Sequence, residues 1–226
     1  VDAMWEIHPM LKDWECMTDL LLEDPVNPED GLDDIHERFL IEIIACCVKQ
    51  AATGEYPIVR RTQQSRKLTS KELKQVQDDR ALLTQHFIVT LPTLLTKYVA
   101  DAEKLVYLLQ IPSYFELNQY SVRRQEKNLE KLLQLIQEIV TKHNDSDVLD
   151  ECSKCLAYMC DEDSSIYSKC NIVRSSILDD LVNAFTSSMK KFDQQNEADE
   201  NEMYPLMIAL KRLSAFAVNH NIANYD

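Results

Sequence analysis

The sequence contains almost no glycine: only Gly31 and Gly54 occur in 226 residues. Loops that cradle phosphate and turns that bind dinucleotides need several glycines close together, because the backbone there approaches the phosphate with positive φ angles. Sheet proteins also usually need glycine for turns and bulges. The shortage therefore excludes both kinds of nucleotide-binding loop, and it favours helices joined by short polar turns.

The sequence also lacks the patterns of a catalytic or metal site. Its five histidines form no HExxH motif and belong to no cysteine-nucleophile signature. One CxxC pair, Cys152 and Cys155, lies inside a predicted helix, whereas structural zinc usually needs two such pairs or a Cys/His pair on turns. Adjacent carboxylates such as Asp179 and Asp180 point to different sides of a helix. We therefore expect no enzyme activity, no bound metal and no cofactor.

Long hydrophobic runs are missing as well. No run approaches the roughly 20 apolar residues of a membrane helix, and the charged start of the chain does not resemble a signal peptide. The seven cysteines are odd in number and lie mostly in apolar helical patterns, which is typical of reduced thiols in the cytosol or nucleus. We expect no membrane contact. Because the chain does not begin with methionine, we also expect it to be a segment of a longer protein.

Apolar residues recur at helical spacing along most of the chain. Those at 129, 132, 133, 136, 139 and 140 share one helical face, and 178–192 and 206–217 repeat the pattern. Thr69 and Glu72 form a predicted capping box at the start of the helix over about 70–100. Pro92 lies inside this helix and is expected to kink it. The sequence predicts helices over about 2–7, 9–23, 32–53, 70–100, 102–110, 120–143, 146–160, 172–195 and 200–219.

The predicted helices come in pairs that recur about every 40 residues, which is the period of HEAT-type arrays. The pattern predicts an all-α, HEAT-like helical-repeat solenoid, a superhelix of antiparallel helix pairs that forms one domain over residues 1–226. A compact helical bundle is the alternative. Residues 54–68, GEYPIVRRTQQSRKL, lack helical periodicity and are expected to form a mobile basic loop.

Positive charge is scarce except in one short segment. The formal net charge is −14, yet PIVRRTQQSRKLTSKELK (57–74) holds six cations and one acid. The candidate nucleic-acid-binding residues are Arg60, Arg61, Arg66, Lys67, Lys71 and Lys74. Polar residues between them can also bond phosphate, and the shortage of aromatic residues argues against base stacking. Three interpretations remain open: contact with the phosphates of DNA or another polyanion, an acidic protein partner, or a solvated linker.

Five long segments carry a family resemblance. They are DAMWEIHPMLKDWECMTDLLLEDP (2–25), LIEIIACCVKQAA (40–52), DDRALLTQHFIVTLPTLLTKYVADAEKLVYLLQIPSYFEL (78–117), RRQEKNLEKLLQLIQEIVTKHNDSDVLDECSK (123–154) and LKRLSAFAVNHNI (210–222). Together they resemble the stromal antigen family of cohesin subunits, also called stromalin or STAG. The resemblance covers essentially the whole chain and is similar to the middle of an animal member.

The resemblance implies a non-enzymatic HEAT scaffold of the cohesin complex, with a role in sister-chromatid cohesion and chromosome organisation. The implied partners are the kleisin subunit, double-stranded DNA held through its phosphate backbone, and regulators such as shugoshin. The implied location is the nucleus, on chromatin, chromosomes and centromeres. The family's matching segment is also basic, which favours DNA contact at the six cations. The alternative is a protein-only helical-repeat adaptor whose basic loop binds an acidic partner.

Overall fold

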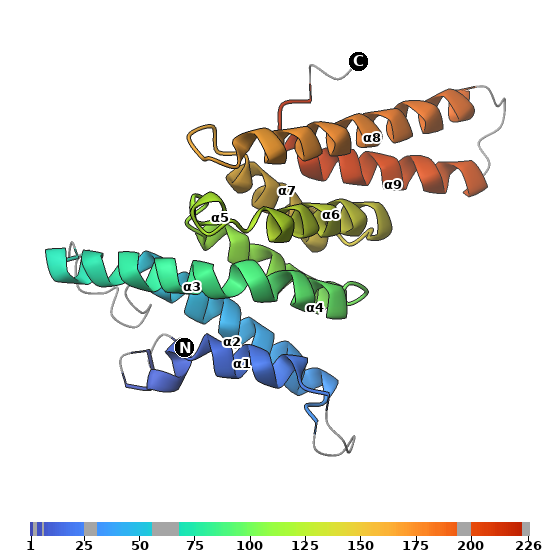
Figure 1. Ribbon diagram of the computed structural model, residues 1–226. Helices are drawn as coiled ribbons and strands as arrows, with labels where there is room; N and C mark the ends of the chain where they lie inside the picture. Colours follow the sequence, from blue (N-terminus) through green and yellow to red (C-terminus); the bar gives the residue numbers. More distant parts are fainter. Residues whose placement is uncertain (2–3, 6, 25–30, 56–67, 194–199, 223–226) are drawn as a thin grey trace. The chain divides into compact units, whose positions relative to one another are not determined.

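A computed structural model describes residues 1, 4–5, 7–24, 31–55, 68–193 and 200–222 (Figure 1). These residues form helices and turns and contain no β-strand, which confirms the predicted all-α class. Their contacts divide the chain into two units, Val1–Leu129 and Glu130–Asp226. A single domain over 1–226 stays a prediction. So does the mobile loop at 54–68, because residues 56–67 lie outside the described part of the chain.

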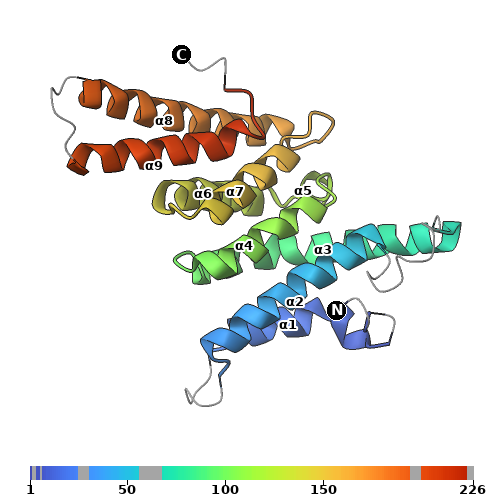
Figure 2. The ribbon, with the colours of Figure 1, turned by 180° about the vertical axis from the view of Figure 1, so that it is seen from behind.

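The first unit is built around α2, which packs against α1, α3 and α4. Seen from behind, α2 crosses between α1 and α4 (Figure 2). The elements of this unit are the 3-10 helix η1 (Pro9–Lys12), α1 (Trp14–Leu22), α2 (Asp34–Thr53), α3 (Ser70–Lys97), α4 (Ala102–Gln110), the 3-10 helix η4 (Ile111–Tyr114) and α5 (Gln119–Val122).

The core of the first unit lies where the apolar faces of α2, α3 and α4 meet. Ile41 and Ile44 from α2, Leu83 and Phe87 from α3 and Leu108 from α4 are all fully buried. Each pair on one helix is separated by three or four residues, so both side chains lie on the same face. Burying such a side chain stabilises a fold by about 1.5–3 kcal/mol, so these faces fix how the three helices pack.

The second unit contains the helical hairpin of α8 and α9, which lie side by side in both ribbon views (Figures 1 and 2). α9 also packs against α7, and after it ends the His220 Nε2 atom lies 3.0 Å from the carbonyl oxygen of Ser153 in α7. The helices here are α6 (Glu126–Lys142), whose first four residues belong to the first unit, α7 (Ser146–Met159), α8 (Tyr167–Asp193) and α9 (Glu200–Ala217).

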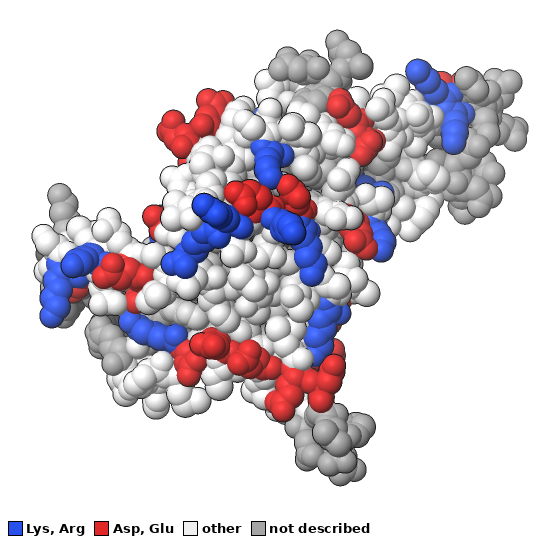
Figure 3. All heavy atoms as spheres, in the orientation of Figure 1, with Lys and Arg blue, Asp and Glu red and all other residues white. Residues whose placement is uncertain are grey.

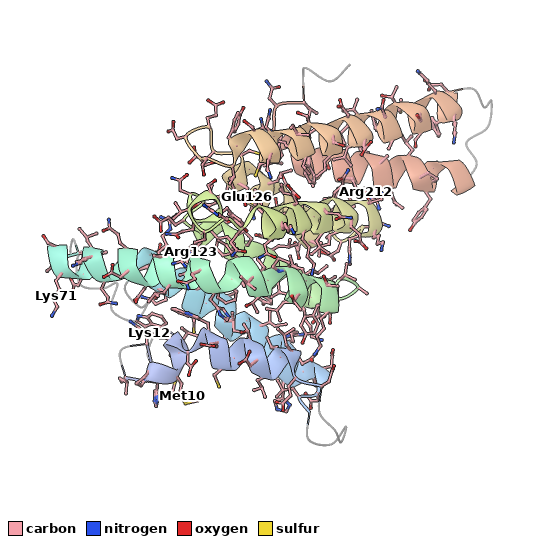
Figure 4. All side chains as sticks on the ribbon, in the orientation of Figure 1. Met10, Lys12, Lys71, Arg123, Glu126 and Arg212 are labelled. Carbon is pink, nitrogen blue, oxygen red and sulfur yellow. The ribbon has the colours of Figure 1, made fainter. Side chains whose placement is uncertain are left out.

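Arg212 joins α9 to the end of α6 within the second unit (Figure 4). Its Nη2 atom donates to the carbonyl oxygen of Thr141 at 2.5 Å and to Asn144 Oδ1 at 2.8 Å, and its Nε donates to the carbonyl oxygen of His143 at 3.2 Å. The last carbonyl groups of a helix have no partner inside the helix, so Arg212 satisfies acceptors that α6 leaves open.

Several helix bounds agree with the sequence, and others differ. The helix predicted over 2–7 is wrong, because the described residues there, Met4, Trp5 and Ile7, form turns, and the helix predicted from 172 begins at Tyr167. The predicted helix over 9–23 is divided at Asp13, whose side chain accepts a hydrogen bond from the Cys16 backbone nitrogen and so caps α1. The predicted single helix over 120–143 is wrong: it ends at Val122 as α5 and restarts at Glu126 as α6. Pro92 lies inside α3, which continues past it to Lys97.

Candidate nucleic-acid interface

The described residues that flank the gap at 56–67 lie close together at the end of α2 and the start of α3. α2 ends at Gly54, which has a positive φ of 61° and closes the helix in the left-handed conformation. A Cβ atom on Gly54 would lie 2.6 Å from Val76 Cγ2 and 3.2 Å from Leu68 Cδ1. The described residues on either side of the gap, the end of α2 and the start of α3, therefore lie close together in the first unit.

The capping box at the start of α3 is present as predicted. The Glu72 backbone nitrogen donates to Thr69 Oγ1 at 3.3 Å, and the Thr69 backbone nitrogen donates to Glu72 Oε2 at 2.6 Å. The Glu72 carboxylate thus already occupies the positive end of the helix. The capping box therefore uses the backbone N–H groups of Thr69 and Glu72, and its carboxylate disfavours a second anion at this helix end.

The structure describes two of the six predicted site residues. Lys71 and Lys74 are exposed on the first turns of α3, and a spacing of three residues places them on one helix face. The other four predicted residues lie outside the described part of the chain: Arg60, Arg61, Arg66 and Lys67. The structure therefore brings Lys71 and Lys74 together, and the six-residue site stays a prediction.

Several other cations of the first unit are used in internal contacts. Arg80 donates to the carbonyl oxygens of Tyr114 and Phe115 at 3.0 and 2.8 Å. Lys12 Nζ lies 3.2 Å from Asp79 Oδ2, and the Lys104 side chain is buried. These side chains hold the fold together, so they are less available to phosphate than exposed cations without an ion pair.

A second group of cations is free to meet a ligand. Among the described residues of the first unit, Lys71, Lys74, Arg123, Arg124 and Lys127 form no ion pair, and all five are exposed. Lysine and arginine atoms lie at the end of α3 where Lys71 is labelled, with acidic atoms beside them (Figures 3 and 4). Arg123 is labelled on the same face, at the turn between α5 and α6 (Figure 4).

Sequence reasoning missed Arg123, Arg124 and Lys127. The signal was present in the string RRQEK at 123–127, but the prediction placed it inside one continuous helix over about 120–143 and gave it no separate interpretation. The break after Val122 gathers these residues at one turn instead.

The four buried cysteines of the second unit are unsuited to nucleophilic chemistry. Burial raises the pKa of Cys152 and Cys155, the CxxC pair, and raises that of Cys160 to about 11 and that of Cys170 to about 12. These thiols stay protonated at neutral pH, whereas the thiolate is the reactive and metal-binding form. In the described ranges no group of three His, Cys, Asp or Glu side chains could hold a metal ion.

None of the described helices is both long enough and apolar enough to cross a bilayer.

Comparison with known proteins identifies the family. The family model of the cohesin subunit SCC3/SA HEAT-repeats domain matches residues 1–226. The chain belongs to this family. It is 45% identical over 228 residues to the cohesin subunit SA-1 of Xenopus laevis, 42% identical over 228 residues to SA-3 of Homo sapiens, and 33% identical over 226 residues to scc-3 of Caenorhabditis elegans.

Each of these matches covers all of this chain but only 18%, 18% and 20% of the relative's own length. The chain thus spans about a fifth of the curated relatives it matches. Its membership confirms the predicted resemblance and the HEAT-like helical-repeat solenoid as the fold class.

Proposed function

We propose that this chain is a non-enzymatic scaffold segment of the cohesin complex that binds the kleisin subunit and contacts duplex DNA. The observation that carries the proposal is the match of the SCC3/SA HEAT-repeats family over all 226 residues. Regulators such as shugoshin are further proposed partners. The proposed setting is sister-chromatid cohesion on chromatin in the nucleus, including centromeres.

The fold supports a scaffold better than an enzyme. The described helices bury their apolar faces against one another, and the thiols of the CxxC pair are buried and protonated. Helical-repeat proteins present extended surfaces on which partner chains dock, and they need no catalytic group for this task.

The charge distribution supports DNA contact through phosphates. The six predicted cations lie in an acidic chain, which keeps a polyanion away from most of the surface and leaves it few places to bind. Lys71 and Lys74 sit on an ordered helix face without an ion-pair partner among the described residues. Cations of this kind pair with phosphate and carry no base readout, so binding is expected to be independent of DNA sequence.

Kleisin binding is tested by mixing the purified chain with the kleisin subunit and measuring the dissociation constant by calorimetry. A stoichiometric complex that survives moderate salt supports the scaffold role. Absence of binding, in a chain shown to be folded by circular dichroism, contradicts kleisin binding by this segment.

DNA contact is tested with a charge-reversed variant in which Arg60, Arg61, Arg66 and Lys67 are replaced by Glu. Wild-type chain is expected to bind duplex DNA without sequence preference and to lose affinity steeply as salt rises, and the variant is expected not to bind. If both proteins bind DNA equally poorly, the segment is not a phosphate contact. If the charge-reversed variant loses affinity for acidic peptides but binds DNA as the wild-type chain does, the protein-only adaptor is favoured instead.

A further inference from the structure

The turn between α5 and α6 is closed by a specific hydrogen-bond pattern. The Gln125 backbone nitrogen donates to the carbonyl oxygen of Tyr120 at 2.8 Å, and the Arg124 backbone nitrogen donates to that of Ser121 at 3.2 Å. These two bonds make up the Schellman motif, which ends a helix by placing one residue in the left-handed conformation. Here that residue is Arg124, with a φ of 54°.

An arginine is an unusual occupant of this position. Glycine is the usual residue because it has no Cβ and adopts positive φ at no steric cost, and asparagine is the next choice. Arg124 is the one non-glycine residue with positive φ among those the structure describes. Local strain of this kind tends to occur where a side chain has a task beyond folding.

The surroundings of Arg124 indicate what that task is. Arg123, Arg124 and Lys127 are exposed, and none of them forms an ion pair with another described residue of the first unit. Arg123 Nε donates to Gln119 Oε1 at 2.9 Å, which positions the guanidinium while leaving its other N–H groups available. Glu126 is the one acid in the string RRQEK, so this turn carries a net charge of +2.

We infer that Arg123, Arg124 and Lys127 form a second phosphate-binding contact for duplex DNA, separate from the segment at 60–74. Guanidinium groups bind phosphate through paired N–H donors, and lysine adds a point charge. Both contacts belong to the first unit, and Arg123 and Lys71 are seen on the same face of it (Figure 4). The inference rests on the proposed DNA contact and adds a place where the duplex is held.

The sharpest test changes Arg124 alone. In Arg124→Gly the side chain is lost but the left-handed conformation becomes easier, so the thermal midpoint should stay equal or rise. A plot of log affinity against log salt should become shallower by about 0.9, which is the contribution of one phosphate contact on duplex DNA. Arg124→Lys keeps the charge and should keep the slope.

The triple variant R123Q/R124G/K127Q extends the test and should lower the slope by up to about 2.7, at about 0.9 for each contact. The probe is a fluorescently labelled duplex of random sequence, read by anisotropy. The matched control is K190Q/K191Q, which removes two exposed cations near the end of α8 and should leave the slope unchanged.

Three outcomes would overturn the inference, and they differ in what they mean for the segment at 60–74. If the triple variant keeps the wild-type slope while the charge reversal at 60–67 abolishes binding, the second contact is wrong and the first one stands. If the wild-type chain binds no DNA, both are wrong. If R124G lowers the thermal midpoint and leaves the slope intact, the arginine has a structural role, and the inference is overturned.

Discussion

Lys104 is the most informative single residue for testing how the first unit is held together. Its side chain is 3% exposed, and its ammonium group faces three carboxylates. Nζ lies 2.8 Å from Asp101 Oδ2 and 3.2 Å from Glu37 Oε2, and it also contacts Asp34. The same ammonium lies 5.1 Å from the ring centre of Tyr98. One buried cation thus links the starts of α2 and α4.

Replacing Lys104 by Met should destabilise the first unit by about 2–3 kcal/mol. Removing one partner of a buried ion pair typically costs about 3–5 kcal/mol, because the opposite charge is left uncompensated. The cost is smaller here because the carboxylates keep other contacts with water and protein. Asp34 is 85% exposed, and Glu37 still accepts from the Tyr98 hydroxyl at 2.8 Å. Methionine keeps most of the buried apolar stem of the lysine.

The assay is urea unfolding followed by circular dichroism, with Lys154→Met as the matched control. Lys154 also meets two carboxylates, but it is 49% exposed, so its loss should cost less than about 1 kcal/mol. A loss below about 1 kcal/mol for Lys104→Met as well would refute the reasoning, since the buried cluster would then behave like a surface ion pair.

The pH dependence of the unfolding free energy of wild type and of Lys104→Met gives a second check. Burial opposes ionisation of Asp101, but hydrogen bonds from Lys104 outweigh it and hold the pKa of Asp101 below its ordinary value of 3.8. The stabilisation is therefore present above that pH and is lost as the pH falls through the lower pKa of the folded state. The stability difference between wild type and Lys104→Met should shrink in acid.

Three further predictions concern single residues. Gly54→Ala should cost at least about 1 kcal/mol in urea unfolding, because φ is 61° and the new Cβ would lie 2.6 Å from Val76 Cγ2; equal stability would contradict the close approach. Thr69→Ala should lower the free energy of unfolding by about 1 kcal/mol through loss of the α3 cap, and Thr69→Ser should restore it. Burial lowers the pKa of His220 despite its hydrogen bond to Ser153, so the unfolded state binds a proton more readily than the folded state. The stability of the protein should therefore fall as the pH drops below about 6.5. A His220→Asn variant should show a flatter dependence of the thermal midpoint on pH between about pH 7 and 5.

The sequence predicted the helices well where local signals and burial agree. The α4 helix was predicted over 102–110 and ends at those residues, because Asp101 caps one end and Pro112 follows the other. The capping box of Thr69 and Glu72 was also visible as a pattern of residue types. Such features depend on neighbours in the sequence and need no knowledge of the tertiary fold.

The break between α5 and α6 could not be predicted in the same way. Helix ends of this type are usually marked by glycine, and Arg124 stands there instead, so the sequence carried no glycine signal for the end of α5. The buried position of Lys104 was equally hidden, since its carboxylate partners Asp34 and Glu37 are distant in sequence. The clustering of free cations at 123–127 followed from that unpredicted break.

The measurement that tests the central claim most directly is the salt dependence of duplex DNA affinity for the wild-type chain and for R60Q/R61Q/R66Q/K67Q. Each phosphate contact contributes about 0.9 to the slope of log affinity against log salt. The account predicts that the slope of the variant is lower by up to about 3.6, with circular dichroism unchanged. An unchanged slope in a folded variant would show that the basic segment does not hold DNA.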